Sequence, residues 1–266
     1  MKKLYISADI EGTCGIAHWD ETAKDKRDYP AFARQMTREV AAACEGALEA
    51  GMDFILVRDA HGSARNIEAA LLPPQVQVLR GWGPDPLCMV HGLDDSFHAV
   101  VFTGYHDAAG AGANPLAHTM DTDLVWFTLN GDTVSEAMLN AYAAAYFRVP
   151  LAAITGDQGI CDRMQDLIPA LTAVPINKGQ GGAVLSVHPE EAVKRIRDGV
   201  LKALKNGVED SLLTLPESFR ADMRFRNVQR AYRAGFYPGM QMLDSHTLRF
   251  ETANYYELLR MVHFCV

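Results

Sequence analysis

Short apolar runs of strand length alternate with helical stretches through the first half of the chain, and this alternation constrains the fold more than any other feature. The helical stretch at 31–50 is rich in alanine and ends at Gly51, a residue type that commonly closes a helix. Strands that alternate with helices typically form a mostly parallel sheet with helices on both faces. The apolar runs occupy residues 4–10, 54–57, 99–103 and 151–155. We therefore predict a three-layer α/β fold, in which helices flank a mostly parallel sheet.

Two local signals lie in the middle of the chain. Asn130-Gly131 follows a strand-like run at 124–129 and readily adopts the positive φ angles of a two-residue turn, so we predict a hairpin inserted into the sheet. Ser135 precedes a helical run at 137–147 and can cap it with its hydroxyl oxygen. Glu136 is then expected in the first turn of that helix.

The pattern of alternating apolar runs and helical stretches changes past about residue 185. A charged helical stretch, two strand-like stretches and a C-terminal helix follow, and the first three occupy residues 189–206, 219–228 and 247–250. We predict a larger α/β catalytic domain at 1–185, which carries the candidate metal-binding residues described below. The remainder, 186–266, is expected to form a smaller C-terminal α+β lobe or to pack as part of the same domain.

Charge and cysteine content exclude several classes of partner. The formal net charge is −8 and there is no extended lysine or arginine cluster, whereas binding to nucleic-acid phosphates needs concentrated positive charge. The first apolar run meets Asp9 too soon to act as a signal peptide or a membrane span. The five cysteines are scattered and form no Cys-x-x-Cys pair, which indicates reduced thiols. We expect a cytoplasmic protein with small-molecule substrates and no nucleic-acid or membrane partner.

Side chains that bind metals follow the ends of three predicted strands. Asp9 and Glu11 end the first strand, His61 follows the second, and His106 follows the run at 99–103. The carboxyl ends of parallel strands meet at one edge of a sheet, where sites of α/β proteins form. Asp9 and Glu11 are two residues apart, so an extended chain directs both carboxylates to the same side. These side chains are therefore expected to converge, with Glu136 facing them from its helix.

The residue types in this set favour a metal centre. Carboxylates held together repel one another unless they share a proton or a cation. Two imidazoles beside them favour zinc or a similar transition metal over magnesium or calcium. Three carboxylates and two histidines are also enough to hold two divalent cations. We predict a two-metal site.

Each of these residues also has an ordinary structural explanation. Asp9 and Glu11 can be a solvated or helix-capping pair, and His61 and His106 can be loop residues that contact backbone groups. Glu136 can simply complement the dipole of its helix. Agreement of three strand ends and one helix start on a single edge is what favours the metal centre.

Several motifs are similar to those of one known family. Ser7-Ala8-Asp9-Ile10-Glu11-Gly12 resembles the Ser-x-Asp-x-Glu-Gly signature of the DppA-type D-aminopeptidases. The other matching segments are Asp59-Ala60-His61, Gly92-Leu93-Asp94-Asp95-Ser96-Phe97, Gly104-Tyr105-His106, Ala117-His118-Thr119-Met120 and Val134-Ser135-Glu136-Ala137-Met138-Leu139-Asn140. They occur in family order and at nearly family spacing between about residues 4 and 157. Ala60 stands where the family has serine, and the loop from His106 to His118 is one residue longer.

The resemblance implies a site and an assembly. It implies two zinc ions per subunit, with Asp9 bridging them, and a catalytic role for His118, which reasoning from the residues alone does not single out. It also implies a ring-based homo-oligomer, a decamer, whose inner channel admits only short peptides. The implied zinc ligands are Asp9, Glu11, His61, His106 and Glu136.

We therefore predict a zinc-dependent aminopeptidase that removes the N-terminal residue of short peptides, D-Ala-D-Ala-like ones in particular, by means of a metal-activated water. Two alternatives stay open. The same ligands suit another two-metal hydrolase, such as an amidase or a phosphoesterase, and a doubly wound sheet can also serve as a binding module without catalysis. The number of bound metal ions and their coordination separate these alternatives. One tightly held ion with no open position favours a structural site, whereas two ions with exchangeable water favour catalysis.

Overall fold

The main sheet of the computed structural model, which describes residues 1–266, has seven strands in the order β3-β2-β1-β4-β7-β8-β9. All neighbouring pairs are parallel except β8 and β9, which form an antiparallel hairpin. The strands are β1 (Lys3–Ala8), β2 (Phe54–Asp59), β3 (Val76–Leu79), β4 (Ala99–Tyr105), β7 (Leu151–Asp157), β8 (Thr172–Gln180) and β9 (Ala183–Ser186). The four predicted apolar runs are confirmed as β1, β2, β4 and β7.

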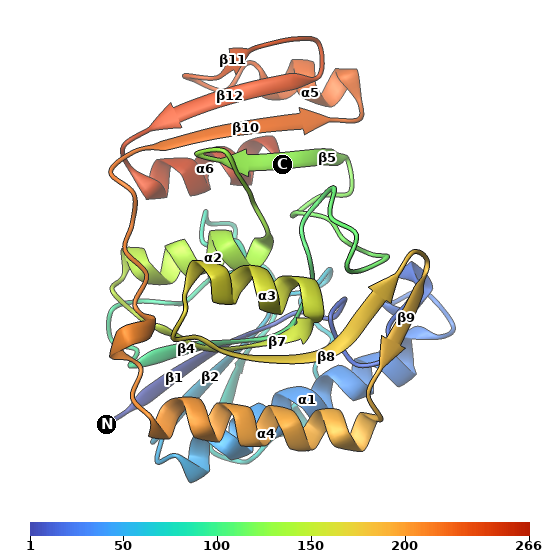
Figure 1. Cartoon of the computed structure of the whole chain (residues 1–266), viewed down its shortest axis with the longest axis vertical. Coiled ribbons are helices and arrows are strands. Elements are labelled where there is room, and N and C mark those ends of the chain that lie inside the picture. Colours follow the sequence, from blue (N-terminus) through green and yellow to red (C-terminus); the bar gives the residue numbers. More distant parts are fainter.

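Helices cover both faces of this sheet (Figure 1). On one face lie α1 (Tyr29–Glu49) and α4 (Pro189–Lys205), and on the other lie α2 (Glu136–Tyr146) and α3 (Gln158–Leu167), with α6 (Tyr255–Cys265) packed on α2. Side chains of each strand alternate between two cores: Leu4 and Ile6 pack toward α1, whereas Tyr5 packs on the opposite face. The predicted three-layer α/β class is therefore confirmed.

Helix α4 shows how local sequence sets these boundaries. His188 caps its first turn, with Nδ1 accepting from the backbone N–H of Glu190 at 3.2 Å, and Pro189 follows as the first helical residue. Acidic residues occupy the first turn and lysines the last, which complements the helix dipole. The short 3₁₀ helices are η1 (Trp19–Glu21), η2 (Ala69–Leu71), η3 (Cys88–Val90) and η4 (Glu209–Ser211).

A second, antiparallel sheet lies beyond α2 and α6, in the order β11-β12-β10-β5-β6 (Figure 1). Its elements are β5 (Leu124–Leu129), β6 (Asp132–Thr133), β10 (Phe219–Phe225), β11 (Gln241–Met242) and β12 (Thr247–Thr252), with α5 (Val228–Ala234) between β10 and β11. The Asn130-Gly131 turn is confirmed, with φ angles of 55° and 98°. The hairpin does not join the main sheet as predicted. Along β5, Leu124, Phe127 and Leu129 are buried whereas Val125 is exposed, which suits a strand covered mainly on one face.

This second sheet draws strands from both sides of residue 185, and α4 packs against α1 beneath the main sheet. The division into 1–185 and 186–266 stays a prediction. None of the helices is both long and apolar enough to cross a membrane.

Candidate metal centre

The predicted ligands converge at the carboxyl edge of the main sheet. Asp9 and Glu11 follow β1, His61 lies two residues beyond the end of β2, and His106 is the first residue after β4. Since β2, β1 and β4 are adjacent and parallel, their ends bring these side chains into one place. Glu136 reaches the same place as the first residue of α2.

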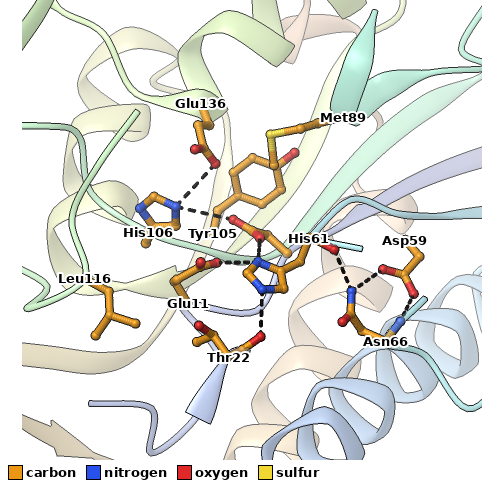
Figure 2. A network of polar contacts seen from close by, with 12 residues as sticks. Glu11, Thr22, Asp59, His61, Asn66, Met89, Tyr105, His106, Leu116 and Glu136 are labelled. Atoms are coloured by element: carbon orange, nitrogen blue, oxygen red, sulfur yellow. Dashed lines mark hydrogen bonds and ion pairs between the residues drawn. The ribbon is translucent and has the colours of Figure 1, made fainter. Parts of the chain in front are cut away.

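Asp9 lies at the centre of the cluster, with one carboxylate oxygen toward each histidine. Its Oδ1 is 3.3 Å from His61 Nδ1, and its Oδ2 is 3.4 Å from His106 Nε2. Glu11 Oε2 lies 3.1 Å from His61 Nδ1, and Glu136 Oε2 lies 3.3 Å from His106 Nε2. Figure 2 shows His61 beside Glu11 and His106 beside Glu136. The geometry therefore forms two ligand groups that Asp9 joins.

Burial makes this cluster costly without a cation. Asp9 and Glu11 are each only 2% exposed and His106 only 1%. Although these groups approach one another to 3.1–3.4 Å, Asp9 Oδ2, Glu11 Oε2 and His106 Nε2 form no hydrogen bond, whereas buried polar atoms are nearly always hydrogen-bonded. Two sets, Asp9 with Glu11 and His61, and His106 with His118 and Glu136, have ligand atoms within 4.8 Å of one another. The donor types and the unpaired atoms fit two divalent metal ions of the zinc type.

Charge in the cluster also favours a cation. Burial raises the pKa of Asp9 well above its usual value, and the negative charge of Glu11 adds to the effect. Burial opposes ionisation of Glu11 too, but the charge of His61 holds its pKa well below the usual value. Burial lowers the pKa of His106, yet the nearby charge of Glu136 outweighs it and raises that pKa well above normal. The buried negative charge of these carboxylates is therefore stable only beside positive charge, which metal ions can supply.

Each imidazole is oriented by a backbone carbonyl oxygen on the side away from the carboxylates. His61 Nε2 lies 2.9 Å from the Thr22 oxygen, His106 Nδ1 lies 2.9 Å from that of Asp107, and His118 Nδ1 lies 2.9 Å from that of Leu116. Such a contact fixes the tautomer and turns the other nitrogen toward the cluster. The contact to Thr22 is visible in Figure 2.

Buried polar contacts hold the loops that carry the ligands. Asp59, at the end of β2, accepts from the backbone N–H of Asn66 and from its side chain, and Asn66 Nδ2 also donates to the His61 oxygen at 2.7 Å (Figure 2). Ser135 caps α2 by accepting from the Met138 N–H at 3.1 Å, which fixes the position of the first helical residue, Glu136. The predicted Ser135 cap is therefore present.

His118 lies at the rim of the cluster. Its ring stacks on His106 with a centroid distance of 4.3 Å, and its Nε2 is 3.4 Å from Glu136 Oε1. Its side chain is 13% exposed, whereas that of His106 is fully buried. His118 therefore faces both the ligands and the open space above them.

A cavity of about 330 Å³ opens over these residues. Five lining residues were not predicted from sequence: Trp19, Trp82, Cys88, Met89 and Met120. Trp82 stacks over the buried Arg58 guanidinium at 4.6 Å and donates to the Gly62 oxygen at 2.7 Å. Met120 lies in the family-like segment Ala117-His118-Thr119-Met120, whereas no motif marks the other four, because loops that are distant in sequence bring them to the cavity.

The chain is similar to known proteins over nearly its whole length. A family model described as D-aminopeptidase matches residues 1–264. A D-aminopeptidase of Bacillus subtilis (strain 168) is 31% identical over 248 residues, which cover 92% of this chain and 89% of that protein. The solved structure of a Zn-dependent D-aminopeptidase from Bacillus subtilis, described as a self-compartmentalizing protease, superposes with a TM-score of 0.91 at 29% identity. That match covers 99% of this chain and 97% of the other.

Proposed function

This chain belongs to the D-aminopeptidase family, and from that premise we propose that it is a zinc-dependent aminopeptidase that removes the N-terminal residue of short peptides containing D-amino acids. One observation carries the proposal: Asp9 lies between two histidines in a buried cluster whose unpaired atoms face one another. The similar solved structure is that of a Zn-dependent enzyme, which supports zinc as the metal.

In this proposal the chain holds two zinc ions. Asp9, Glu11 and His61 hold one ion, and His106 and Glu136 hold the other, with Asp9 as the shared ligand. The position of Asp9 between His61 and His106 supports this assignment, as do the two separate ligand groups, the second of which also includes His118 at the rim. When bound, zinc supplies a Lewis acid that polarises a carbonyl oxygen and makes water acidic enough to react near neutral pH.

His118 is proposed to move the proton that the departing amine needs. Its Nδ1 faces the Leu116 carbonyl oxygen and keeps its proton there, so Nε2 is the atom that gains and releases a proton. That atom faces the cavity beside Glu136 Oε1, which already accepts from the Met120 N–H at 2.7 Å. A positioned imidazole of this kind suits general acid and base catalysis.

The cavity supports a small, peptide-like substrate. Its volume is near the lower end of ordinary ligand pockets, and it is flanked by the rings of Trp19 and Trp82. No lysine or arginine lines it, although phosphate recognition ordinarily uses such residues. This favours peptide hydrolysis over phosphoester hydrolysis.

We also propose that the chain assembles into a ring-based decamer that encloses the sites. The similar solved structure is described as self-compartmentalizing, which supports an assembly. Large apolar side chains are exposed on and around α5 and α6, as expected of a contact surface: Tyr232, Phe236, Met242, Leu243 and Phe264.

The test is release of alanine from D-Ala-D-Ala and, in parallel, from L-Ala-L-Ala by zinc-loaded protein, with a chelated sample as the blank. We expect metal-dependent cleavage of the D-peptide and two zinc ions per chain by elemental analysis. Cleavage of the L-peptide alone would keep the mechanism and overturn the substrate. Cleavage of neither, with two metals bound, would favour an amidase, and one inert metal would favour a binding module.

A further inference from the structure

A second, smaller cavity of about 120 Å³ adjoins the cavity over the metal ligands. It is enclosed by α2, by α6 and by the loop that leads into η3; its lining residues include Leu87, Leu139, Asn140, Leu259, Val262 and His263. Cys88 and Met120 line both cavities, so these two side chains form the boundary between them. We call the smaller space the side pocket.

The two cavities differ sharply in polarity. The larger one contains three carboxylates and two imidazoles, whereas the side pocket contains no acidic residue, lysine or arginine. Its two polar side chains are His263, which is exposed, and Asn140, which is buried and whose Nδ2 already donates to Tyr105 Oη at 3.1 Å and to Met89 Sδ at 3.4 Å. The side pocket therefore suits an apolar group. A dry cavity of about 150 Å³ can hold benzene, so a branched aliphatic side chain is the matching size.

The boundary residues have an unusual backbone. Cys88 and Met120 both adopt positive φ angles, 49° and 64°, in the left-handed region that side chains other than glycine rarely occupy. Contacts hold both in place: the Met120 N–H donates to Glu136 Oε1 at 2.7 Å, and the Cys88 oxygen accepts from the His91 N–H at 3.1 Å. Conformations of this kind persist only where the surroundings enforce them, and they cluster at ligand sites.

We propose that the side pocket receives the side chain of the N-terminal residue of the peptide and selects branched aliphatic residues there. This inference rests on the proposed aminopeptidase function. The amine and the carbonyl group of the first residue must both lie at the metal ligands, and its side chain branches from the carbon atom between them. The side chain therefore needs a space next to the metal ligands. The side pocket is such a space, because Met120, which lines both cavities, donates its N–H to Glu136 at 2.7 Å.

The first test compares D-Leu-D-Ala with D-Ala-D-Ala in the holoenzyme. We expect kcat/KM for D-Leu-D-Ala to be roughly tenfold higher, the effect typical of filling an apolar pocket with added methylene groups. Val262→Phe fills the side pocket and should reverse this preference. Leu259→Ala enlarges it and should raise the relative rate for D-Phe-D-Ala. Met261→Leu, a buried change on the same helix outside the pocket lining, is the control and should leave the preference unchanged.

Calorimetric binding of free D-leucine and D-alanine to the same proteins gives a readout that does not depend on turnover. D-Leucine should bind more tightly than D-alanine to the wild type and should lose that advantage in Val262→Phe. If Val262→Phe lowered kcat/KM equally for both peptides and lowered the affinity equally for both amino acids, the inference would be overturned while the aminopeptidase function stayed intact. A preference that follows the second residue, as in D-Ala-D-Leu, would also overturn it. If no peptide is cleaved, the proposed function fails, and D-leucine binding alone judges the side pocket.

Discussion

At the scale of single residues, the site depends on how each imidazole is turned. In His61, His106 and His118, one ring nitrogen contacts a backbone carbonyl oxygen, so the other nitrogen faces the carboxylates or the cavity. In His61 and His106 this other nitrogen faces Asp9, whereas in His118 it lies at the rim. This difference in position separates the proposed ligands from the proposed proton carrier.

Replacing His118 by alanine tests that separation. We expect His118→Ala to keep two zinc ions and to lose about 10²- to 10⁴-fold in kcat, the usual contribution of a general acid or base. Elemental analysis and steady-state kinetics check the two parts of the prediction. His98→Ala, far from the cluster in a loop before β4, is the control and should change neither value. A variant that binds only one zinc ion would instead identify His118 as a ligand.

Glu39 in α1 predicts a pH dependence of stability that is independent of catalysis. Burial raises the pKa of Glu39 to about 7, and its Oε2 has no hydrogen-bond partner. The folded state therefore holds the Glu39 proton more tightly than the unfolded state. The contribution of this proton to the free energy of unfolding is complete below the unfolded pKa of 4.5 and is lost as the pH rises through about 7. The full loss is about 3 kcal/mol, since one pKa unit corresponds to about 1.4 kcal/mol.

Glu39→Gln should remove this dependence. The amide oxygen of glutamine can still accept from the backbone N–H of Cys14, which lies 3.0 Å from Glu39 Oε1. Urea unfolding at pH 5 and pH 8 should show the variant gaining on the wild type at the higher pH. Glu45→Gln, exposed on the same helix, is the control. An equal stability difference at both pH values would contradict the prediction.

At the scale of elements, the strand ends can converge only because the backbones approach closely beyond β1 and β4. The Gly12 N–H donates to the Gly104 oxygen at 2.8 Å, and a Cβ at position 12 would lie 1.9 Å from the Tyr105 oxygen. The glycine that ends the Ser-x-Asp-x-Glu-Gly motif thus lets Glu11 and His106 share one cluster. Its role is steric.

Gly12→Ala should therefore separate these two segments. We expect a loss of about 1–3 kcal/mol in the free energy of unfolding, the usual cost of overpacking, together with weaker zinc binding. Urea unfolding and a competitive zinc titration measure the two effects. Gly182→Ala, where a Cβ meets nothing within 4 Å, is the matched control. If the free energy of unfolding of Gly12→Ala were unchanged, the segments beyond β1 and β4 would be able to move apart without loss of stability, and the prediction would be wrong.

At the scale of the whole molecule, the second sheet and α5 add a surface that the main sheet and its helices do not have. Tyr232 lies in α5 and Phe236 just after it; the two residues are 61% and 72% exposed, and their rings are in contact at a centroid distance of 5.1 Å. Aromatic side chains exposed together are typical of protein contact surfaces.

Removing these rings tests the proposed assembly. The wild type should have a mass in solution of about ten times 29.2 kDa, and Phe236→Ser with Tyr232→Ser should reduce it to smaller species. Light scattering after size exclusion measures this. Leu71→Ser, which removes an exposed apolar side chain from η2 beside α1, is the control. A wild type of 29.2 kDa would contradict the decamer, and an unchanged variant would place the contact elsewhere.

The sequence by itself determined four of the seven strands of the main sheet, the helices α1, α2 and α4, and which polar residues converge at the carboxyl edge; β3, β8, β9 and α3 were not predicted. Parallel strands buried on both faces are mostly apolar, so β1, β2, β4 and β7 are visible as apolar runs. Polar residues that follow such runs must then lie at one edge of the sheet, so the sequence predicts that Asp9, Glu11, His61 and His106 lie together. The cap at Ser135 and the Asn130-Gly131 turn are likewise set by neighbouring residues.

Only the tertiary structure decided how the strand at 124–129 pairs, which nitrogen of each histidine faces the ligands, and that Cys88 and Met120 divide two cavities. Strand β5 pairs with β10, nearly a hundred residues away, and no local pattern encodes such a partner. His118 was identified only through family resemblance, because its contacts to His106 and Glu136 come from a loop without periodicity. Local sequence sets conformation and burial, whereas contacts between distant segments exist only once the chain has folded.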